Sequence, residues 1–329
     1  MDLNKEIYEI SRASIDLCTK CQLSCICCST SKGVIRNGFV KEGYMSFDMF
    51  RHIVETNPEL KEFEMSNWGE IFLNPQILDI FEFAYNKGIK LYCGNGTNFN
   101  YVPDSVLEGL VKYRIEYLNL SIDGTSQNVY VKYRRNGNYD RVISNIEKLN
   151  VFKKLYNSPY PKLSWQFIIF GHNEHQIASA KSECERLGMV FNPKMNHSNF
   201  SPICDQEYVK QVTGLDYSSR EEFQRKTKKT YKSPCYQCLF SPQINWNGDV
   251  LGCCVNKWGA FGNVSHNTLR EIMEGKKYQA MLNLLTGKSI DESIDLPCHE
   301  CPNLKMVKES PISIEGLIEY KSFIHPALR

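Results

Sequence analysis

The chain has 329 residues, and its 39 Lys and Arg nearly balance its 37 Asp and Glu, so the formal net charge is +2. This length suffices for one large domain and a small one, whereas the near-neutral charge excludes nucleic acid as the expected partner, because phosphate binding requires clustered basic charge. The absence of an apolar signal segment or membrane span excludes a membrane protein, and it predicts a cytoplasmic chain whose fourteen cysteines bind metal instead of forming disulfides.

The first predicted element is a short strand over residues 14–17. Directly after it come three cysteines with the spacing Cys21-x3-Cys25-x2-Cys28. Three thiolates within eight residues can hold one face of a four-iron cluster and leave the fourth iron without a protein ligand. Because Cys18 precedes the three, a closed four-cysteine site that carries electrons or holds zinc is the alternative.

Strand-like and amphipathic helix-like runs alternate from residue 13 to about residue 195. The predicted strands are residues 14–17, 62–66, 90–94, 117–122, 163–170 and 190–194, and the predicted helices are residues 47–56, 76–86, 105–112, 140–155 and 175–187. This alternation predicts an α/β fold with a parallel sheet. Six strands are too few for a closed barrel of eight, so we expect a partial (βα)6 TIM-like barrel with its chemistry at the carboxyl ends of the strands.

Polar residues follow several predicted strands. Gly69 and Glu70 follow the second strand, where a glycine allows close backbone approach to a ligand and a carboxylate complements an ammonium group. Asn95 follows the third strand, and alternation places Ser121 and Asp123 on one face at the end of the fourth. Each strand end is also compatible with an ordinary turn.

A polar, irregular stretch over residues 197–233 precedes a second cysteine-rich region. Cys235-x12-Gly248-x4-Cys253 and Cys298-x2-Cys301 supply four thiolates, which suit an iron–sulfur cluster or zinc. Cys238 is the alternative to Cys235. Within this region an Asn-Gly pair predicts a hairpin of residues 243–246 and 250–252, and a helix is expected over residues 269–285.

Four features in order resemble the radical S-adenosylmethionine (SAM) superfamily: the three-cysteine loop, Gly69-Glu70 within residues 67–75, Ser121-x-Asp123-Gly124, and residues 169–174, which are similar to an Ile-x-Gly-x-x-Glu element. In that family the amino and carboxylate groups of SAM chelate the open iron, reductive cleavage produces a 5′-deoxyadenosyl radical, and the radical takes hydrogen from the substrate. The second cysteine region resembles the SPASM domain, and more closely its shortened twitch form with a single auxiliary [4Fe-4S] cluster.

The resemblance implies roles for individual residues. Cys27 stands where the family usually has an aromatic residue beside the adenine, and Arg134 stands where the family places a basic residue near the SAM carboxylate. The implied cofactor-binding residues are Cys27, Gly69, Glu70, Asn95, Ser121, Asp123, Arg134 and Ile169. The implied cluster ligands are Cys21, Cys25, Cys28, Cys235, Cys253, Cys298 and Cys301, with Cys238 as the alternative to Cys235. Cys254 is a candidate hydrogen donor, with a packed structural cysteine as the alternative.

The expected organisation is a radical SAM barrel over residues 13–200, a linker over 201–233, an auxiliary-cluster domain over 234–305 and a tail over 306–329. The expected cofactors are SAM and two [4Fe-4S] clusters. The leading functional hypothesis is an oxidoreductase that acts on a small polar molecule of sugar or aminocyclitol type, with an auxiliary cluster that accepts an electron and an external reductant of flavodoxin or ferredoxin type. The alternatives are a maturase that oxidises, crosslinks or epimerises a peptide, and a non-catalytic electron carrier.

Overall fold

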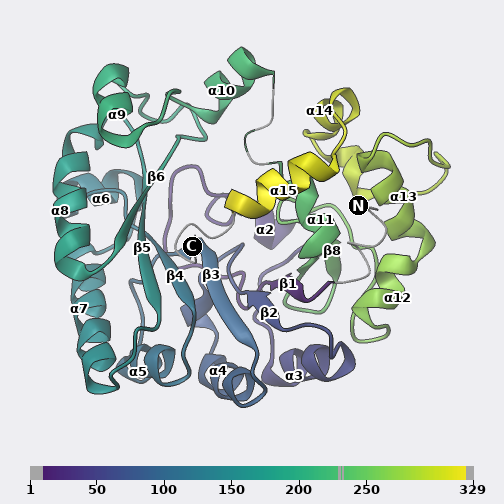
Figure 1. Ribbon diagram of the computed structural model, residues 1–329, viewed down its shortest axis with the longest axis horizontal. Helices are drawn as coiled ribbons and strands as arrows, with labels where there is room; N and C mark the ends of the chain where they lie inside the picture. The colour runs from purple at the N-terminus through teal and green to yellow at the C-terminus, as the bar shows by residue number, and fades with distance from the viewer. Residues whose placement is uncertain (1–9, 229–230, 232, 324–329) are drawn as a thin grey trace.

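The computed structural model describes residues 10–228, 231 and 233–323 (Figure 1). The predicted irregular stretch over residues 197–233 and the predicted tail over residues 306–329 therefore lie partly outside the described residues, which omit 1–9, 229–230, 232 and 324–329. Among the described helices none is long and apolar enough to cross a membrane.

Six parallel strands form the body of the sheet and confirm the predicted partial barrel. They are β1 (Arg12–Ile15), β2 (Glu62–Glu64), β3 (Lys90–Thr97), β4 (Tyr117–Ser121), β5 (Lys162–Ile168) and β6 (Val190–Lys194), and each pairs in parallel with the next. The carboxyl ends of parallel strands share one edge, so the loops that follow them converge on one side of the sheet.

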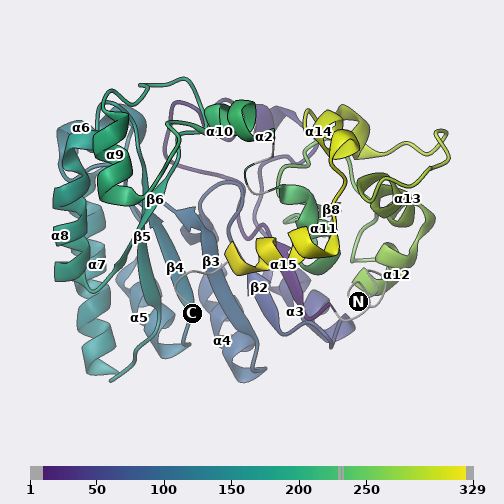
Figure 2. The same ribbon diagram turned by 45° about the horizontal axis from the view of Figure 1, so that its top comes forward.

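Helices cover the outer side of this curved sheet in both views (Figures 1 and 2). The long helices that follow the strands are α3 (Phe47–Thr56), α4 (Ile77–Asn86), α5 (Asp104–Lys112), α7 (Tyr139–Leu155) and α8 (Ile177–Leu187), with the shorter α2 (Val34–Asn37), α6 (Gln127–Tyr133), η1 (Ile71–Leu73) and η2 (Glu174–Gln176) between them. Polar side chains cap α3 and α7: Ser46 accepts from the Met49 amide, and Asn138 accepts from the Arg141 amide. Strand β4 is buried at all five positions because helices cover one face and the interior fills the other.

The predicted hairpin extends the same sheet. Strand β7 (Gln243–Ile244) pairs in parallel with β1, and β8 (Val250–Gly252) pairs antiparallel with β7, which gives the order β6-β5-β4-β3-β2-β1-β7-β8. The second cysteine region is therefore joined edge-on to the barrel through β1. The local alternation of residues predicts a hairpin, but it carries no information about the strand with which that hairpin pairs.

Two predictions of secondary structure were wrong. Residues 197–233 contain α9 (Gln206–Thr213) and α10 (Arg220–Thr227), two short helices that are capped by the Asp205 and Ser219 side chains. Val209 is the buried residue of α9, and α10 buries none, so the apolar pattern of this stretch is too short to predict them. The single helix expected over residues 269–285 is two helices, α12 (Leu269–Glu274) and α13 (Lys276–Leu285), because Gly275 takes an extended conformation between them.

The C-terminal segment also contains helices. The remaining elements are η3 (Pro234–Tyr236), α11 (Gln237–Phe240), η4 (Pro297–Glu300), α14 (Leu304–Glu309) and α15 (Ile314–Phe323). In both views α15 crosses the open side of the sheet (Figures 1 and 2). The predicted tail is therefore part of the wall that faces the strand ends.

A buried relay of side chains ties the hairpin to the barrel. The Asp16 carboxylate accepts from the Trp68 amide at 3.1 Å and from Gln243 Nε2 at 2.9 Å. Gln237 Nε2 donates to Gln243 Oε1 at 3.2 Å, and the Cys254 amide donates to Gln237 Oε1 at 2.8 Å. All three relay side chains, at positions 16, 237 and 243, are buried.

The two ends of this relay determine its direction. The Cys254 amide can only donate, so Gln237 presents its oxygen there and its nitrogen to Gln243. Gln243 then presents its nitrogen to residue 16, which also faces the donating Trp68 amide. Residue 16 must accept at both oxygens, and a carboxylate meets that requirement whereas an amide does not.

We therefore predict that Asp16→Asn and Gln237→Glu each lower the free energy of unfolding. The double variant should lose less of this free energy than the two single variants lose together. Each single change leaves two donors or two acceptors facing each other in the interior, which costs about 1–3 kcal/mol. In the double variant the Gln243 amide turns over, so that it accepts from the new amide at position 16 and donates to the new carboxylate at position 237, and each hydrogen bond is restored. Urea unfolding of the four proteins gives the coupling free energy, and strictly additive effects would contradict the relay.

Candidate functional site

The first cysteine loop lies between β1 and α2. Cys25 is buried, while Cys21 and Cys28 are partly buried. Burial, together with the negative charge of Glu70, Cys25 and Cys28, raises the pKa of Cys21 to about 12, so the three thiols of the motif are electrostatic neighbours. Burial also raises the pKa of Cys18 to about 11, but the charges that act on Cys18 are those of Glu70, Lys20 and Asp16.

The Gly69–Glu70 pair packs against the backbone of this loop. Gly69 has φ +73°, and a side-chain carbon there would lie 2.5 Å from the Cys18 carbonyl oxygen, so the position requires glycine. The Glu70 amide donates to the Lys20 carbonyl oxygen at 2.8 Å. The backbone that comes close to Gly69 is therefore that of the cysteine loop.

The Glu70 carboxylate is buried and bonded to the end of β3. It accepts from the Thr97 hydroxyl and, at 2.6 Å, from the Asn98 amide. Burial raises the pKa of Glu70, although these hydrogen bonds oppose the shift. The sequence predicted that Glu70 binds the ammonium group of a ligand. In the structure its carboxylate accepts hydrogen bonds from the protein instead.

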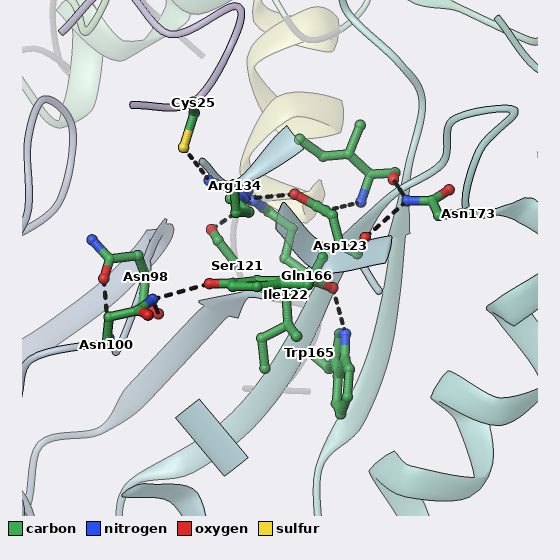
Figure 3. Close-up of polar contacts among 12 residues, drawn as sticks. Cys25, Asn98, Asn100, Ser121, Ile122, Asp123, Arg134, Trp165, Gln166 and Asn173 are labelled. Carbon is green, nitrogen blue, oxygen red and sulfur yellow. Dashed lines mark hydrogen bonds and ion pairs between the residues drawn. The ribbon is translucent and has the colours of Figure 1, made fainter. Parts of the chain in front are cut away.

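Asp123, Arg134 and Cys25 form one linked group (Figure 3). Arg134 Nε donates to Asp123 Oδ2 at 2.6 Å, and Arg134 Nη1 lies 3.8 Å from Cys25 Sγ. Asp123 Oδ1 accepts from the Ile168 amide at 2.7 Å, which fixes the carboxylate to the end of β5. Burial raises the pKa of Asp123, and the positive charge of Arg134 opposes that shift.

The other predicted cofactor residues lie at different depths. Asn95 lines a cavity at the strand ends, and its Nδ2 donates to the Ser66 carbonyl oxygen at 2.7 Å. Ser121 Oγ accepts from Gln166 at 3.2 Å. Ile169 is completely buried in the core, so its side chain is remote from any ligand. Cys27 is half-buried and packs with the three-cysteine loop in an apolar cluster that includes Tyr133 and Phe170.

A cavity of about 570 Å³ lies at the carboxyl ends of the strands. Its walls come from the strand ends, from the segment predicted to be irregular, from the hairpin region and from α15. They include Arg12, Glu64, Asn95, Gln166, Lys194, His197, Arg220, Gln237, Cys254 and Tyr320. The segments of the chain that sequence analysis treated as separate domains therefore enclose one space.

Sequence reasoning missed Glu64 and Arg220 in this cavity. Glu64 ends β2, and its carboxylate accepts from the Ser66 hydroxyl at 2.6 Å and from the Gly94 amide at 2.8 Å. Burial raises the pKa of Glu64. Glu64 could have been found as a carboxylate at the end of a predicted strand. Arg220 could have been found as the first residue after a serine that caps a helix.

The second cysteine group converges on a single pocket. Cys235, Cys238, Cys253, Cys298 and Cys301 all line it, so both of the alternatives at positions 235 and 238 are present. The hydrogen bond between Cys238 and Cys253 raises the pKa of the first thiol and lowers that of the second. Five soft sulfur donors around one pocket fit an iron–sulfur cluster.

Cys253 and its neighbour Cys254 face different spaces. Cys253 lines the cysteine pocket, whereas Cys254 lines the cavity at the strand ends. In the part of the chain that the structure describes, no group of three His, Cys, Asp or Glu side chains is arranged to hold a single metal ion. The thiols of the first group lie on a loop, whereas Cys235, Cys238 and Cys298 of the second group lie in short helical turns.

Two family models match the chain. The radical SAM superfamily model matches residues 15–173, and the SPASM iron–sulfur cluster-binding domain model matches residues 235–302. A comparison with curated proteins gives no match. The matched ranges contain the first and second cysteine groups respectively.

Solved structures share the fold at low sequence identity. Streptococcus suis SuiB bound to S-adenosylmethionine has a TM-score of 0.60 at 16% identity over 92% of this chain and 73% of that chain. The structure of anSMEcpe with bound AdoMet has a TM-score of 0.56 at 14% identity, over 95% and 92%. BtrN in complex with AdoMet and 2-DOIA has a TM-score of 0.46 at 12% identity, over 82% and 84%.

The matched domains also establish the cofactor classes. The radical SAM domain implies SAM and a [4Fe-4S] cluster, and the SPASM domain implies additional iron–sulfur chemistry. The thiol groups described above fit both requirements. The chain belongs to the radical SAM superfamily and carries a C-terminal SPASM domain.

Proposed function

We propose that this enzyme is a radical SAM oxidoreductase that acts on a small polar molecule, with a sugar or an aminocyclitol as the expected type. The observation that carries the proposal is the cavity of about 570 Å³, whose wall includes charged and amide side chains. Arg134, at the three-cysteine loop, is an electrostatic neighbour of His197 in the cavity wall, and Cys254, next to the cysteine pocket, lines the same cavity. A substrate held there would lie between the two cysteine groups.

In this proposal Cys21, Cys25 and Cys28 hold the first [4Fe-4S] cluster. Asp123 orients the Arg134 guanidinium beside Cys25, where it would bind the SAM carboxylate. Asn95, Ser121 and Asp123 would support the ribose, and Cys27 with the backbone at Ile169 would border the adenine. Gly69 and Glu70 would act by fixing the cysteine loop against the end of β3. When bound, SAM and this cluster supply the radical that removes hydrogen from the substrate.

An auxiliary cluster would be held by Cys235, Cys253, Cys298 and Cys301, with Cys238 as the alternative to Cys235. Such a cluster supplies an acceptor for one electron. Oxidation of a hydroxyl-bearing carbon also releases a proton. Glu64 is the only carboxylate among the described residues that line the cavity, and we assign it the role of accepting that proton at Oε2.

The finer expectations about setting and organisation belong to the same proposal. We propose that the enzyme is cytoplasmic and that it receives electrons from a flavodoxin or ferredoxin. We also retain a barrel over residues 13–200 and an auxiliary-cluster domain over residues 234–305, joined by the segment over 201–233. Superfamily membership supports an enzyme over a non-catalytic electron carrier.

A second candidate is a maturase that oxidises, crosslinks or epimerises a peptide. SuiB bound to the precursor peptide SuiA has a TM-score of 0.54 with this chain at 14% identity. In that case Cys254, which lines the cavity, would be the candidate hydrogen donor. The two candidates differ in substrate and share the cluster assignments.

Substrate class is tested by deuterium transfer into 5′-deoxyadenosine. We expect the label to come from a perdeuterated sugar or aminocyclitol in a panel that also contains deuterated short peptides. Transfer confined to the peptides would replace the leading proposal with the maturase. Protein without reductant is the control for exchange that does not depend on the radical.

The cluster assignments predict the iron content of cysteine variants. Anaerobically reconstituted protein should contain about eight irons per chain, and Cys25→Ala should contain about four. Cys18→Ala is the matched control and should retain about eight, because its thiol is not assigned to the open cluster. Loss of about four irons in Cys18→Ala would instead establish a closed four-cysteine site.

Glu64→Gln should lower substrate oxidation by about 100-fold or more, since general-base catalysis contributes about 10²–10⁴-fold. A base acts when deprotonated, so the wild-type rate should fall as the pH decreases through the pKa of Glu64. Burial raises that pKa, so this fall should begin above the ordinary range of a glutamate. A Glu64→Gln profile that retains the same acidic limb would contradict the assignment.

A further inference from the structure

Arg220 at the start of α10 presents a positive charge to the cavity. Its side chain lines the cavity wall, and its guanidinium carbon lies 5.4 Å from the centre of the Tyr231 ring. No carboxylate forms an ion pair with Arg220 among the residues that the structure describes. The surrounding protein lowers the pKa of Arg220, which is the effect expected when a cation is partly removed from water.

The cavity wall is lined by more cationic than anionic side chains. Arg12, Lys194 and Arg220 contribute three cations, and Glu64 contributes one carboxylate. Burial and two nearby guanidinium groups lower the pKa of His197 to about 4, so this histidine is neutral near pH 7. Arg12 forms an ion pair with Glu62 at 3.8 Å, whereas the Arg220 guanidinium contacts the Tyr231 ring.

Arg220 also lies between the two halves of the site. The groups that act electrostatically on its guanidinium are Tyr231, Cys254 and Tyr133. Cys254 follows a predicted ligand of the auxiliary cluster, and Tyr133 precedes Arg134 beside the first cysteine loop. A ligand group bound by Arg220 would thus be held within reach of both.

We propose that Arg220 binds an anionic group of the substrate, a carboxylate or a phosphate, and so restricts the substrate class to sugar acids or sugar phosphates. This inference rests on the proposed function and narrows it. A planar guanidinium presents paired N–H donors that match either anion, and the Tyr231 ring supports the guanidinium plane. A partly desolvated cation gains more from an anionic ligand than from a hydroxyl group.

The test compares glucuronate and glucose 6-phosphate with glucose, by equilibrium dialysis of labelled compounds against SAM-loaded enzyme and by the rate of 5′-deoxyadenosine formation. We expect the anionic compounds to bind about 10- to 100-fold more tightly than glucose, as a charge-assisted hydrogen bond of about 1.5–3 kcal/mol implies. Arg220→Gln should remove this preference, and Arg220→Lys should restore part of it. Tighter binding of only glucuronate would identify a carboxylate as the preferred group, and tighter binding of only glucose 6-phosphate would identify a phosphate.

Arg225→Gln is the matched control, because Arg225 lies on the same helix and is exposed like Arg220 but does not line the cavity. This variant should keep the wild-type preference. The proposal is wrong if the anionic compounds bind no better than glucose, or if Arg220→Gln weakens SAM binding instead of anion binding. Failure of the proposed function is separate, since deuterium transfer into 5′-deoxyadenosine would then be confined to the peptides.

Discussion

The parallel pairing of β7 with β1 is the contact on which the rest of the molecule depends. It adds the hairpin to the edge of the barrel sheet, at the strand that leads directly into the three-cysteine loop. Residues more than 200 positions apart in the chain thereby become neighbours: Ser14 Oγ lies 3.0 Å from Ser241 Oγ. The cavity exists because this pairing places the second cysteine region beside the open side of the barrel.

Buried polar contacts determine how closely the two regions fit together. The relay from Trp68 through Asp16 to Cys254 has fixed donors at both ends, so it fits only one arrangement of its side chains. A hydrophobic contact of the same size would tolerate sliding, whereas unsatisfied donors in the interior are costly. The relay therefore contributes a defined position for the Cys253–Cys254 loop as well as stability.

The electrostatics of the site follow from the same enclosure. Asp123 and Arg134 are both removed from water and are paired at 2.6 Å, which leaves the guanidinium oriented toward Cys25. Arg220 lines the cavity wall without such a carboxylate among the described residues, and Glu64 is bonded to backbone amides at the same wall. The charges of Asp123 and Arg134 neutralise each other, whereas Arg220 in the cavity wall can bind a charged group of a substrate.

The sequence by itself determined the local features: the spacing of Cys21, Cys25 and Cys28, the alternation that produces six parallel strands, and the thiols of the second region. These depend on residue order and period alone. Local patterns missed α9 and α10, whose caps stabilise helices with almost no buried face, and they did not resolve the break at Gly275. Only the tertiary structure decided that β7 pairs with β1, that Glu64 and Arg220 share a cavity, and that Gly69 is required by the cysteine loop. Each of these contacts joins segments far apart in the chain, and a one-dimensional pattern contains no information about which distant groups meet.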